Sequence, residues 1–292
     1  MNNENRAALG KKLLSGPYLF WMVGFTLIPL ALIFWYGITD KSGAFTLQNV
    51  LAIASADHAS ALWLSLGLSL VSTLICLLLA YPLAMILRGR GQAASGFIVF
   101  IFVLPMWMNF LLRTYSWMAI LENNGLLNQL FRKIGLIALY NNIFGTDISF
   151  FRMINTQGAV VLGMVYNYLP FMILPIYSVI VKLDHSLIEA ARDLGANSVQ
   201  VFRRVILPLS LPGVLSGITM VFVPSVSTFA ISKMLGGGTE MLLGDLIEQQ
   251  YMGGAYNPYL GAAISLVMMV IVVICMVVMN RFGEGEEQAV MM

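Results

Sequence analysis

Long apolar runs separated by short polar segments extend along the whole chain. A membrane-spanning helix needs about 20 mostly apolar residues, because each residue advances about 1.5 Å through a hydrocarbon layer about 30 Å thick. Stretches that meet this requirement cover residues 17–38, 61–87, 97–112, 157–181, 213–231 and 261–279. The pattern predicts an all-α, polytopic membrane protein of about six spans, with both chain ends on one side of the membrane.

Two longer segments between the spans carry patterns of their own. Residues 122–156 place apolar side chains at helical spacing with Arg132 and Lys133 opposite, which predicts a helix lying in the outer interface. Residues 233–259 contain a glycine turn and a short helix expected from Glu240 to Gln250. We expect no separate soluble domain. The chain divides into residues 1–60 (tail, first span and outer loop), 61–280 (helical core) and 281–292 (tail).

The most polar stretch within the apolar part of the chain is residues 184–208. Ser186 followed by Glu189 fits a capping box, which predicts that a short helix begins there. We expect Leu187, Ala191 and Leu194 to share one face of this helix, and Ala190 and Ala191 to leave the surface low enough for another protein to approach closely.

Gly195 is placed to end that helix, because glycine adopts the left-handed C-terminal conformation at no steric cost. Asn197 or Ser198 is a candidate N-cap for a second helix. We therefore expect two short helices joined by an elbow, forming a docking surface. The alternative is an amphipathic loop that only connects two spans.

The spacing within this loop resembles the EAA loop of ABC importer permeases. The matching positions are Glu189, Ala190, Ala191, Gly195, Val205, Leu207 and Pro208, and the one departure is Val205, where isoleucine is usual. The resemblance implies a type I importer permease (MetI-like) fold in which the loop sits in a cleft of a cytoplasmic ATPase. It implies ATPase-coupling roles for Asp184, Ser186, Glu189, Ala190, Ala191, Asp193 and Gly195.

Composition argues against a soluble domain and against metal or redox chemistry. Hydrophobic residues make up 59% of the chain, charged residues 10%, and the mean hydropathy is +0.84. Cys76 and Cys275 fall inside spans, which favours packing over a disulfide or a metal pair, and His58 and His185 are too far apart for a local metal motif. We expect no metal and no cofactor. The chain has no phosphate-binding G-x-x-x-x-G-K-[ST] loop, so ATP should bind to a partner.

Basic residues predict the orientation. They gather before the first span, in the loop after the second, in the 184–208 loop and after the last span, at Arg6, Lys11, Lys12, Arg88, Arg90, Lys182, Arg192, Arg203, Arg204 and Arg281. The positive-inside rule places these segments and both termini in the cytoplasm of a bacterial inner membrane. A cleaved signal peptide is the competing interpretation, but the first apolar run is too long and no cleavage site directly follows it.

Charges inside the spans are nearly absent, which argues against an ion-coupled transporter, because such proteins commonly keep an Asp, Glu or His at membrane depth. Arg113 is the nearest exception. Counting from Phe97 at about 1.5 Å per residue puts it about 24 Å across, so we expect it at the interface rather than buried. An intramembrane enzyme is disfavoured because no paired catalytic motif appears in a span. A channel that works without an ATPase remains an alternative.

Prolines within the spans are expected to open the helices, because each removes a backbone hydrogen bond. They are Pro105, Pro170, Pro175 and Pro224. Polar and aromatic residues cluster around them, and we predict that they line the substrate path: Trp107, Asn109, Tyr166, Asn167, Tyr168, Ser225 and Thr228, with the last two on one helix face. Ordinary kinks stabilised by interhelical hydrogen bonds are the alternative.

Further segments resemble the PotB-type permeases of spermidine/putrescine importers, over about residues 61–279. They are residues 103–109, 113–115, 166–172 and 182–196. The resemblance implies a polyamine cargo and four kinds of partner: a second permease (PotC-like), an ATPase dimer (PotA-like), an extracytoplasmic polyamine-binding protein (PotD-like) and the lipid bilayer. Nucleic acid is not expected as a partner. Importers of iron complexes, sulfate or molybdate share the scaffold and remain alternatives.

Local chemistry gives modest support to a polyamine. Aromatic faces hold polycations, which suits Trp107, Tyr166 and Tyr168. Carboxylates in the last outer segment, Glu240, Asp245 and Glu248, would attract cations at the entrance, although a solvated loop would look the same. Lys233 and Arg113 count against this interpretation.

Overall fold

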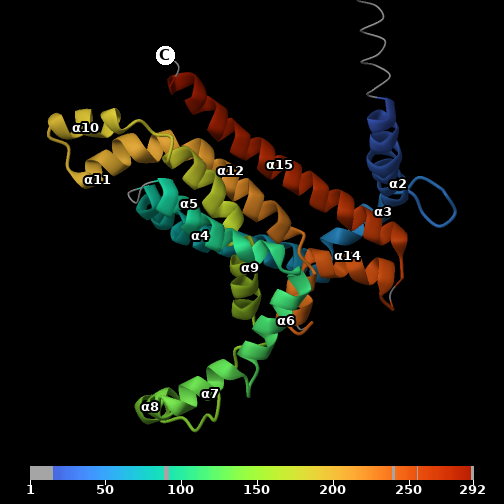
Figure 1. The fold of residues 1–292 in the computed structure, drawn as a ribbon. Helices are drawn as coiled ribbons and strands as arrows, with labels where there is room; N and C mark the ends of the chain where they lie inside the picture. Colours follow the sequence, from blue (N-terminus) through green and yellow to red (C-terminus); the bar gives the residue numbers. More distant parts are fainter. Residues whose placement is uncertain (1–15, 89–91, 239–240, 255, 291–292) are drawn as a thin grey trace, which may run out of the picture. The chain divides into compact units, whose positions relative to one another are not determined.

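The computed structural model describes residues 16–88, 92–238, 241–254 and 256–290, and this part of the chain is almost entirely helical (Figure 1). Within it, the only extended pairing is a single bridge between Thr39 and Phe45. The chain forms two compact units, one of residues 1–59 and 246–270 and the other of residues 60–245 and 271–292. The predicted all-α class is confirmed.

The smaller unit is built on the first apolar helix, Gly16–Gly37. This helix contains a π-helical turn, η1 (Val23–Leu27), and ends as α2 (Ile28–Gly37). The unit also contains short helices and parts of two longer ones: α3 (Gln48–Leu51), η2 (Ala52–Ala54), α14 (Leu243–Met252) and α15 (Pro258–Val290).

Close approach of α2 to α15 depends on Gly37, where a Cβ would lie 2.5 Å from Leu266 Cδ1. Beside this contact, the rings of Tyr36 and Tyr259 meet edge to face with their centroids 5.3 Å apart. Most other side chains of the first apolar helix are exposed, as expected for a helix whose solvent is lipid.

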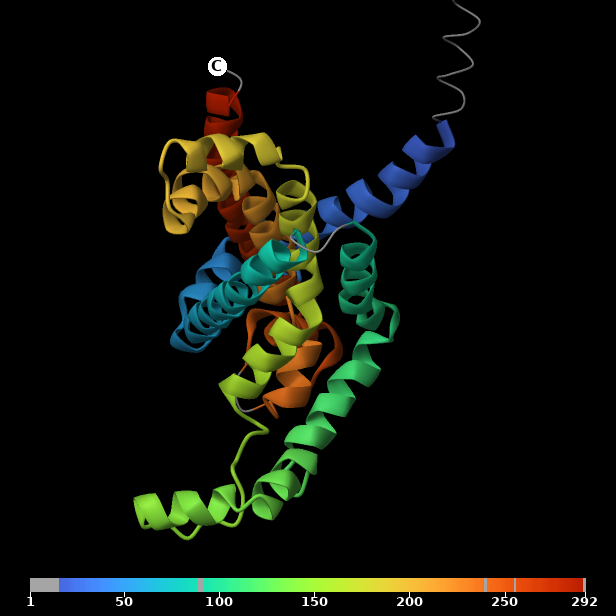
Figure 2. The same ribbon diagram turned by 60° about the vertical axis from the view of Figure 1, so that its left-hand side comes forward.

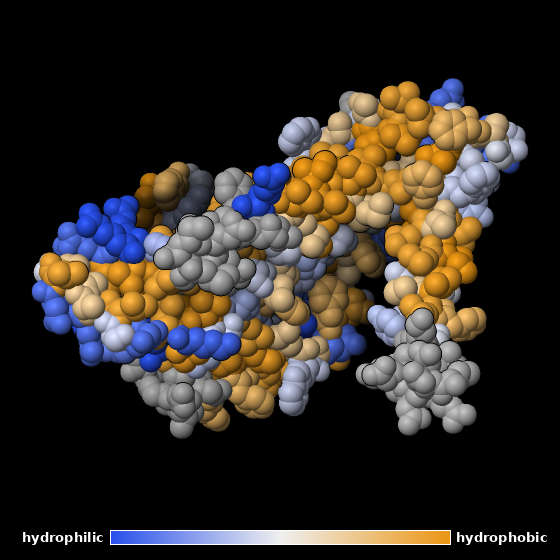
Figure 3. All heavy atoms as spheres, turned by 90° about the horizontal axis from the view of Figure 1, so that it is seen from above, coloured by the Kyte–Doolittle hydropathy of each residue, from blue (hydrophilic) through white to orange (hydrophobic). Residues whose placement is uncertain are grey.

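The larger unit contains the helices that carry the predicted sites. They are α4 (Ala56–Arg88, without its first turn), α5 (Gln92–Val103), η3 (Leu104–Trp107), α6 (Phe110–Leu121), α7 (Leu126–Lys133), α8 (Leu136–Phe144), α9 (Gln157–Ile180), α10 (His185–Asp193), α11 (Ser198–Val201), η4 (Phe202–Ile206), α12 (Leu207–Val226) and α13 (Ala230–Leu235). In this unit α10 and α11 lie at one end, and α7 and α8 lie at the other (Figures 1 and 2). Hydrophilic residues gather at the α10–α11 end (Figure 3).

The core of the larger unit is the contact of α9 with α12, reinforced by α4. Glycines allow the close approach: a Cβ at Gly213 would lie 2.8 Å from the Pro175 carbonyl oxygen, and one at Gly217 would lie 2.7 Å from Met172 Sδ. The face of α4 toward this core is lined by small side chains, Ser65, Ser69, Ser72, Cys76, Ala80 and Ala84. Small residues are common where membrane helices pack, because backbones then approach closely.

Five helices are long and apolar enough to cross a membrane, and a sixth span forms if a bent pair is counted as one. That pair, Phe97–Trp107 and Phe110–Lys133, bends by 92° (Figure 2). The prediction of about six spans is confirmed on this count. The third span, expected as one run over residues 97–112, is instead broken at Met108 and Asn109.

The fifth span also differs from its expected bounds of 213–231. Its helical run begins at Ser198 and ends at Val226, so it continues directly from the polar loop. Thr228 lies in the connection to α13 and shares no helix face with Ser225, which corrects the prediction. The prolines interrupt fewer helices than expected. α9, for example, continues through Pro170 and Pro175.

The predicted helices between the spans are present. α7 and α8 lie within residues 122–156, and α14 overlaps the expected helix before residue 250. Asn128 of α7 is fully buried and holds the segment that follows α8. Its side chain accepts from the Phe151 N–H at 2.9 Å and donates to the Phe151 carbonyl at 3.0 Å.

Candidate functional site

The first helix of the 184–208 loop begins after Asp184. The Asp184 carboxylate accepts a hydrogen bond from the Ser186 backbone N–H at 3.0 Å, and this bond is the main reason that the pKa of Asp184 is lowered. The Glu189 carboxylate reaches back to the His185 side chain, 3.1 Å from its Nδ1, and not to a backbone N–H of the first turn. The predicted Ser186–Glu189 capping box is therefore wrong, because an aspartate earlier in the chain caps the positive end of the helix.

The elbow has the predicted geometry at Gly195, whose φ is +82°. The Gly195 N–H donates to the Arg192 carbonyl at 2.8 Å, and the Ala196 N–H donates to the Ala191 carbonyl at 3.0 Å. These two bonds form a Schellman motif, which ends α10. Asn197 then caps α11 in a reciprocal box with Gln200. The prediction of two short helices joined by a glycine elbow is confirmed.

A small apolar cluster holds the loop in shape. Ile188, Val201 and Ile206 are buried together, with Met85 of α4 packed against them. The Arg88 guanidinium, at the end of α4, donates from Nη2 to the Leu183 carbonyl at 3.0 Å. α11, η4 and α12 form one helical run, which leads from the loop into the core of the larger unit.

The opposite face of α10 is open. Leu187, Ala190 and Leu194 are exposed, Leu194 to 89%, and Val199 of α11 is exposed to 63%. Ala191 is half-buried against the Ile188 cluster, so only one of the two alanines lies on the open face. The predicted coupling residues Ser186, Glu189, Asp193 and Gly195 are also exposed. Exposed large apolar side chains on an otherwise polar loop are typical of a protein-binding surface.

A second group of predicted residues meets where α9 approaches the end of α12. The Tyr168 hydroxyl donates to the Pro224 carbonyl at 3.4 Å, and the Thr228 side chain and the Arg113 guanidinium lie close enough to interact with it. Asn167 is 2% exposed and donates to the Gly163 carbonyl at 2.9 Å. Ser225 is fully buried and donates to the carbonyl one turn earlier in its helix. We name Arg113, Tyr168 and Thr228 the buried polar cluster, because Tyr168 interacts with both of the others. The polar side chains of Asn167 and Ser225 bond within their own helices.

Arg113 was expected at the membrane interface, and that prediction is wrong. Its side chain is only 8% exposed, on α6. The distance count assumed a straight helix from Phe97, whereas the chain bends by 92° before Arg113. Within the described part of the chain, Arg113 Nε and Nη1 and Asn167 Oδ1 have no hydrogen-bond partner. Buried polar atoms usually have a hydrogen-bond partner, so these three atoms are exceptions.

Other predicted path residues make contacts of their own. Trp107 is 77% exposed at the break before α6, with its ring edge to face with Phe100 at 5.9 Å. Asn109 caps α6 by accepting from the Leu111 N–H at 2.9 Å. Tyr166 packs edge to face on Trp117, with ring centroids 5.3 Å apart.

The carboxylates that were predicted to attract cations at the entrance, Glu240, Asp245 and Glu248, do not form a fully exposed acidic loop. Asp245 is half-buried, and its carboxylate accepts from the Ser232 hydroxyl and from the Leu242 N–H, each at 2.9 Å. These bonds join α13 to the start of α14, which is a structural role. Glu240 lies outside the described residues, and Glu248 is half-buried.

The structure thus presents a multi-pass helical membrane subunit in which one end of a helix bundle carries an exposed apolar surface on a polar loop. A model of the protein family described as "Binding-protein-dependent transport system inner membrane component" matches residues 77–284. This range contains the loop, the buried polar cluster, the end of α4, and all of α9 and α12. The chain belongs to this family of ABC importer permeases, and it is a transport subunit of the inner membrane rather than an enzyme.

Relatives and solved structures agree with that assignment. The chain is 35% identical to the spermidine/putrescine transport system permease protein PotB of Haemophilus influenzae, over 90% of this chain and 91% of that protein. It is 34% identical to PotB of Escherichia coli, over 89% and 93%. A bacterial ABC transporter that imports the acidic polysaccharide alginate has the same fold, with a TM-score of 0.78, 16% identity and 96% of each chain covered. The methionine ABC transporter MetNI, in an inward-facing conformation, matches with a TM-score of 0.53 and 21% identity, over 78% of this chain and 95% of that chain.

Proposed function

We propose that this chain is a permease subunit of an ABC importer for polyamines and that the 184–208 loop couples it to a cytoplasmic ATPase. The observation that carries the proposal is the continuous helical run from Ser198 to Val226. One end of this run belongs to the exposed loop, and near its other end the Pro224 carbonyl accepts a hydrogen bond from Tyr168 of the buried polar cluster. A force applied to the loop therefore reaches the predicted substrate path through a single helical run.

The docking surface is the open face of α10 and α11. Leu187, Ala190, Leu194 and Val199 lose their water contacts when a partner covers them, and apolar burial contributes roughly 25 cal/mol per Å². The Gly195 elbow and the Ile188 cluster fix the shape of this face before the partner arrives. A preorganised surface pays less entropy on binding, so docking stabilises the assembled complex more effectively.

Orientation and assembly follow from the loop. Basic residues at Lys182, Arg192, Arg203 and Arg204 favour a cytoplasmic loop, and an even number of spans then puts both chain ends in the cytoplasm. In this arrangement the subunit works beside a second, PotC-like permease, above a PotA-like ATPase dimer, and receives cargo from a PotD-like binding protein. One of the solved relatives of the same fold is a complex with an alginate-bound periplasmic protein, which supports a binding-protein partner.

The similarity to PotB permeases supports a polyamine as the cargo. Trp107, Tyr166 and Tyr168 offer aromatic faces to an ammonium group, and such contacts contribute about 0.5 to 2 kcal/mol each. Entry of a cation is also favoured by an interior-negative membrane potential, by about 2.3 kcal/mol per charge per 100 mV. ATP hydrolysis would then mainly supply direction and concentrating power.

Arg113 favours a second candidate cargo. A buried guanidinium with unpartnered Nε and Nη1 atoms repels a polycation and attracts an anion, such as sulfate, molybdate or an anionic iron complex. The fold is compatible with this cargo, since scaffold alone does not specify the solute.

Uptake by the assembled complex tests both candidates. Vesicles containing both permeases and the ATPase, supplied with the binding protein, should accumulate labelled spermidine or putrescine only when ATP is present on the loop side. Uptake of sulfate, molybdate or iron instead would favour the second candidate. Polyamine flux without ATP would indicate a channel and contradict the proposal.

A further inference from the structure

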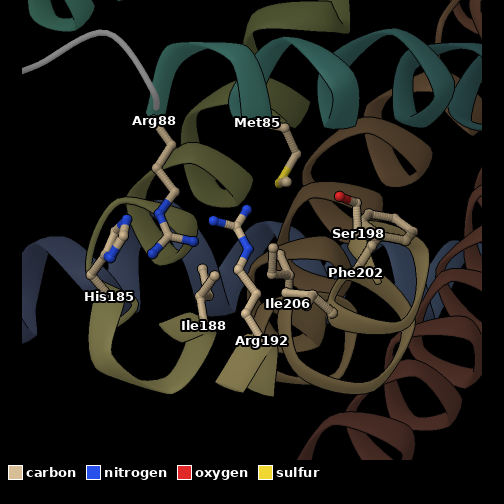
Figure 4. A pocket seen from close by; sticks show the side chains of 9 residues that line it. Met85, Arg88, His185, Ile188, Arg192, Ser198, Phe202 and Ile206 are labelled. Carbon is tan, nitrogen blue, oxygen red and sulfur yellow. The ribbon is translucent and has the colours of Figure 1, made fainter. Parts of the chain in front are cut away.

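A cavity of about 280 Å³ lies behind α10, between the loop and the end of α4. Its polar lining is entirely neutral or basic, with Arg88 from α4, His185 and Arg192 from α10, and Ser198 from α11. No carboxylate lines it. Figure 4 shows the two guanidinium groups pointing toward one another across the open space, with the His185 ring beside Arg88.

The two arginines converge without a counter-ion. Arg88 is positioned by its bond to the Leu183 carbonyl, which among the described residues uses one of its five N–H donors. Among the described residues, neither guanidinium forms an ion pair with a carboxylate. The two positive guanidinium groups repel each other, and an anion bound between them relieves that repulsion. The planar forks of two arginines suit the oxygens of a phosphate, which accepts paired hydrogen bonds from each.

The rest of the cavity lining is apolar, which favours a phosphate that carries an apolar group over a free phosphate ion. Met85, Ile188 and Phe202 form the wall next to the arginines, and Ile188 is buried. The apolar span of α4 ends at Arg88, so the arginines stand at the level of the lipid headgroups. A free phosphate would use only the basic half of the cavity, whereas an anionic phospholipid would use both halves.

We infer that this cavity binds the headgroup phosphate of an anionic phospholipid from the cytoplasmic leaflet, with Arg88 and Arg192 as its ligands and Ser198 as a further donor. The cytoplasmic side rests on the proposed orientation of the loop. A lipid held there bridges the end of α4 to α10 and stiffens the loop that we propose to transmit the ATPase stroke.

The lipid and the ATPase can be bound together, because they use opposite faces of α10. His185, Ile188 and Arg192 follow one another at i, i+3 and i+7 and face the cavity. Leu187, Ala190 and Leu194 lie on the other side and are exposed.

Native mass spectrometry of the purified full-length chain tests this inference. The chain is exchanged into detergent that contains phosphatidylglycerol or phosphatidylcholine, and bound lipid is counted for wild type and for Arg88→Gln/Arg192→Gln. We expect wild type to retain phosphatidylglycerol in preference to phosphatidylcholine. The double variant should bind phosphatidylglycerol about tenfold or more weakly, because charge-assisted bonds are lost. Arg203→Gln/Arg204→Gln, an equal change of charge at exposed positions of the same loop, should reduce binding much less.

Two further arms keep the result decisive. Arg192→Gln alone changes an exposed side chain, so it is expected to fold, and it should still weaken retention. Inorganic phosphate is added to the lipid-free chain and, separately, to the chain with bound phosphatidylglycerol. If phosphate binds with the same affinity as the lipid and displaces it, the cavity is a free-phosphate site and the lipid assignment is overturned. Equal phosphatidylglycerol retention by wild type and both arginine variants would also overturn it. The arginines could instead bind a carboxylate of the ATPase subunit. In that case, binding of the ATPase would depend on Arg88 and Arg192 and lipid retention would not, which would also overturn the lipid assignment. The lipid count needs no cargo and no ATP, so it is independent of whether polyamine uptake succeeds.

Discussion

The hydroxyl oxygens of Tyr81 and Ser210 lie 2.6 Å apart in the interior of the larger unit and join α4 to α12 close to the loop. The Ser210 hydroxyl itself donates to the Leu207 carbonyl at 3.0 Å, so Tyr81 is the donor between the two. The ring of Tyr81 also packs edge to face against Phe202, with centroids 5.5 Å apart. One side chain thus connects the second span, the loop and the fifth span.

Replacing Tyr81 by Phe should lower the stability of the subunit by about 1 kcal/mol, because the hydrogen bond is lost while the ring packing remains. Thermal unfolding of the assembled complex measures this change. Tyr177→Phe is the matched control, since no hydrogen bond of its hydroxyl occurs among the described residues. Equal melting temperatures for Tyr81→Phe and wild type would show that the bond contributes nothing.

Gly195→Ala tests the elbow by conformation alone. A Cβ at Gly195 meets nothing within 4 Å, so the substitution introduces no clash, but φ of +82° costs an alanine about 1 to 2 kcal/mol. We expect the loop to tilt and ATP hydrolysis to become uncoupled from uptake, while substrate still binds at the outer side. Substrate-stimulated ATPase activity and transport are measured in the same vesicles. Gly67→Ala, which also has open space but a helical backbone in α4, should leave both at wild-type levels.

Acid should weaken α10 through Asp184. Because the folded-state pKa of Asp184 is lowered, mainly by the Ser186 N–H, its contribution is fully present above the unfolded value of about 3.9 and is lost as pH falls through the lowered pKa. Hydrogen exchange of the α10 amides, followed from neutral pH into the acid range, should show this loss in wild type. Asp184→Asn, which caps without a charge, should lack the pH step, and Asp184→Ala should exchange faster throughout. A step in all three proteins would assign it to another group.

Arg113→Gln distinguishes the two candidate cargoes by the direction in which uptake changes. If polyamines pass the buried polar cluster, removing the repelling charge should leave polyamine uptake unchanged or raise it a few-fold, and if an anion passes, uptake of that anion should fall at least tenfold. The subunit should not lose stability, because a buried charge without a partner carries a desolvation cost that the neutral glutamine does not. Initial rates over a range of substrate concentrations give the answer. Arg132→Gln, on the exposed part of α7, serves as the control.

Trp107→Ala tests the aromatic part of the path. Trp107 is 77% exposed and free to meet a cation, so its loss should raise the KM for spermidine by a few-fold to about thirtyfold. Trp63 has a similar exposure of 71% on α4, and Trp63→Ala should leave the KM unchanged. Identical kinetics for the two variants would remove Trp107 from the path.

The sequence by itself determined the features that depend on neighbouring residues. Apolar runs of sufficient length located the spans, and a glycine followed by an N-cap residue located the elbow at Gly195, because capping and left-handed turns are decided within one helical turn. The spacing of Glu189, Gly195 and Pro208 was sufficient to identify the permease family for the same reason: the loop carries its signal locally.

Only the tertiary structure decided how distant segments meet. A straight count along the third span could not include a bend at Met108 and Asn109, so Arg113 was expected at the interface and lies buried. Arg88 and Arg192 are remote in the chain, and nothing within either local pattern indicates that they face one cavity. They converge because α4 packs against the loop around Met85 and Ile188. This packing depends on how side chains of different helices fit together, which the periodicity of a single helix cannot predict.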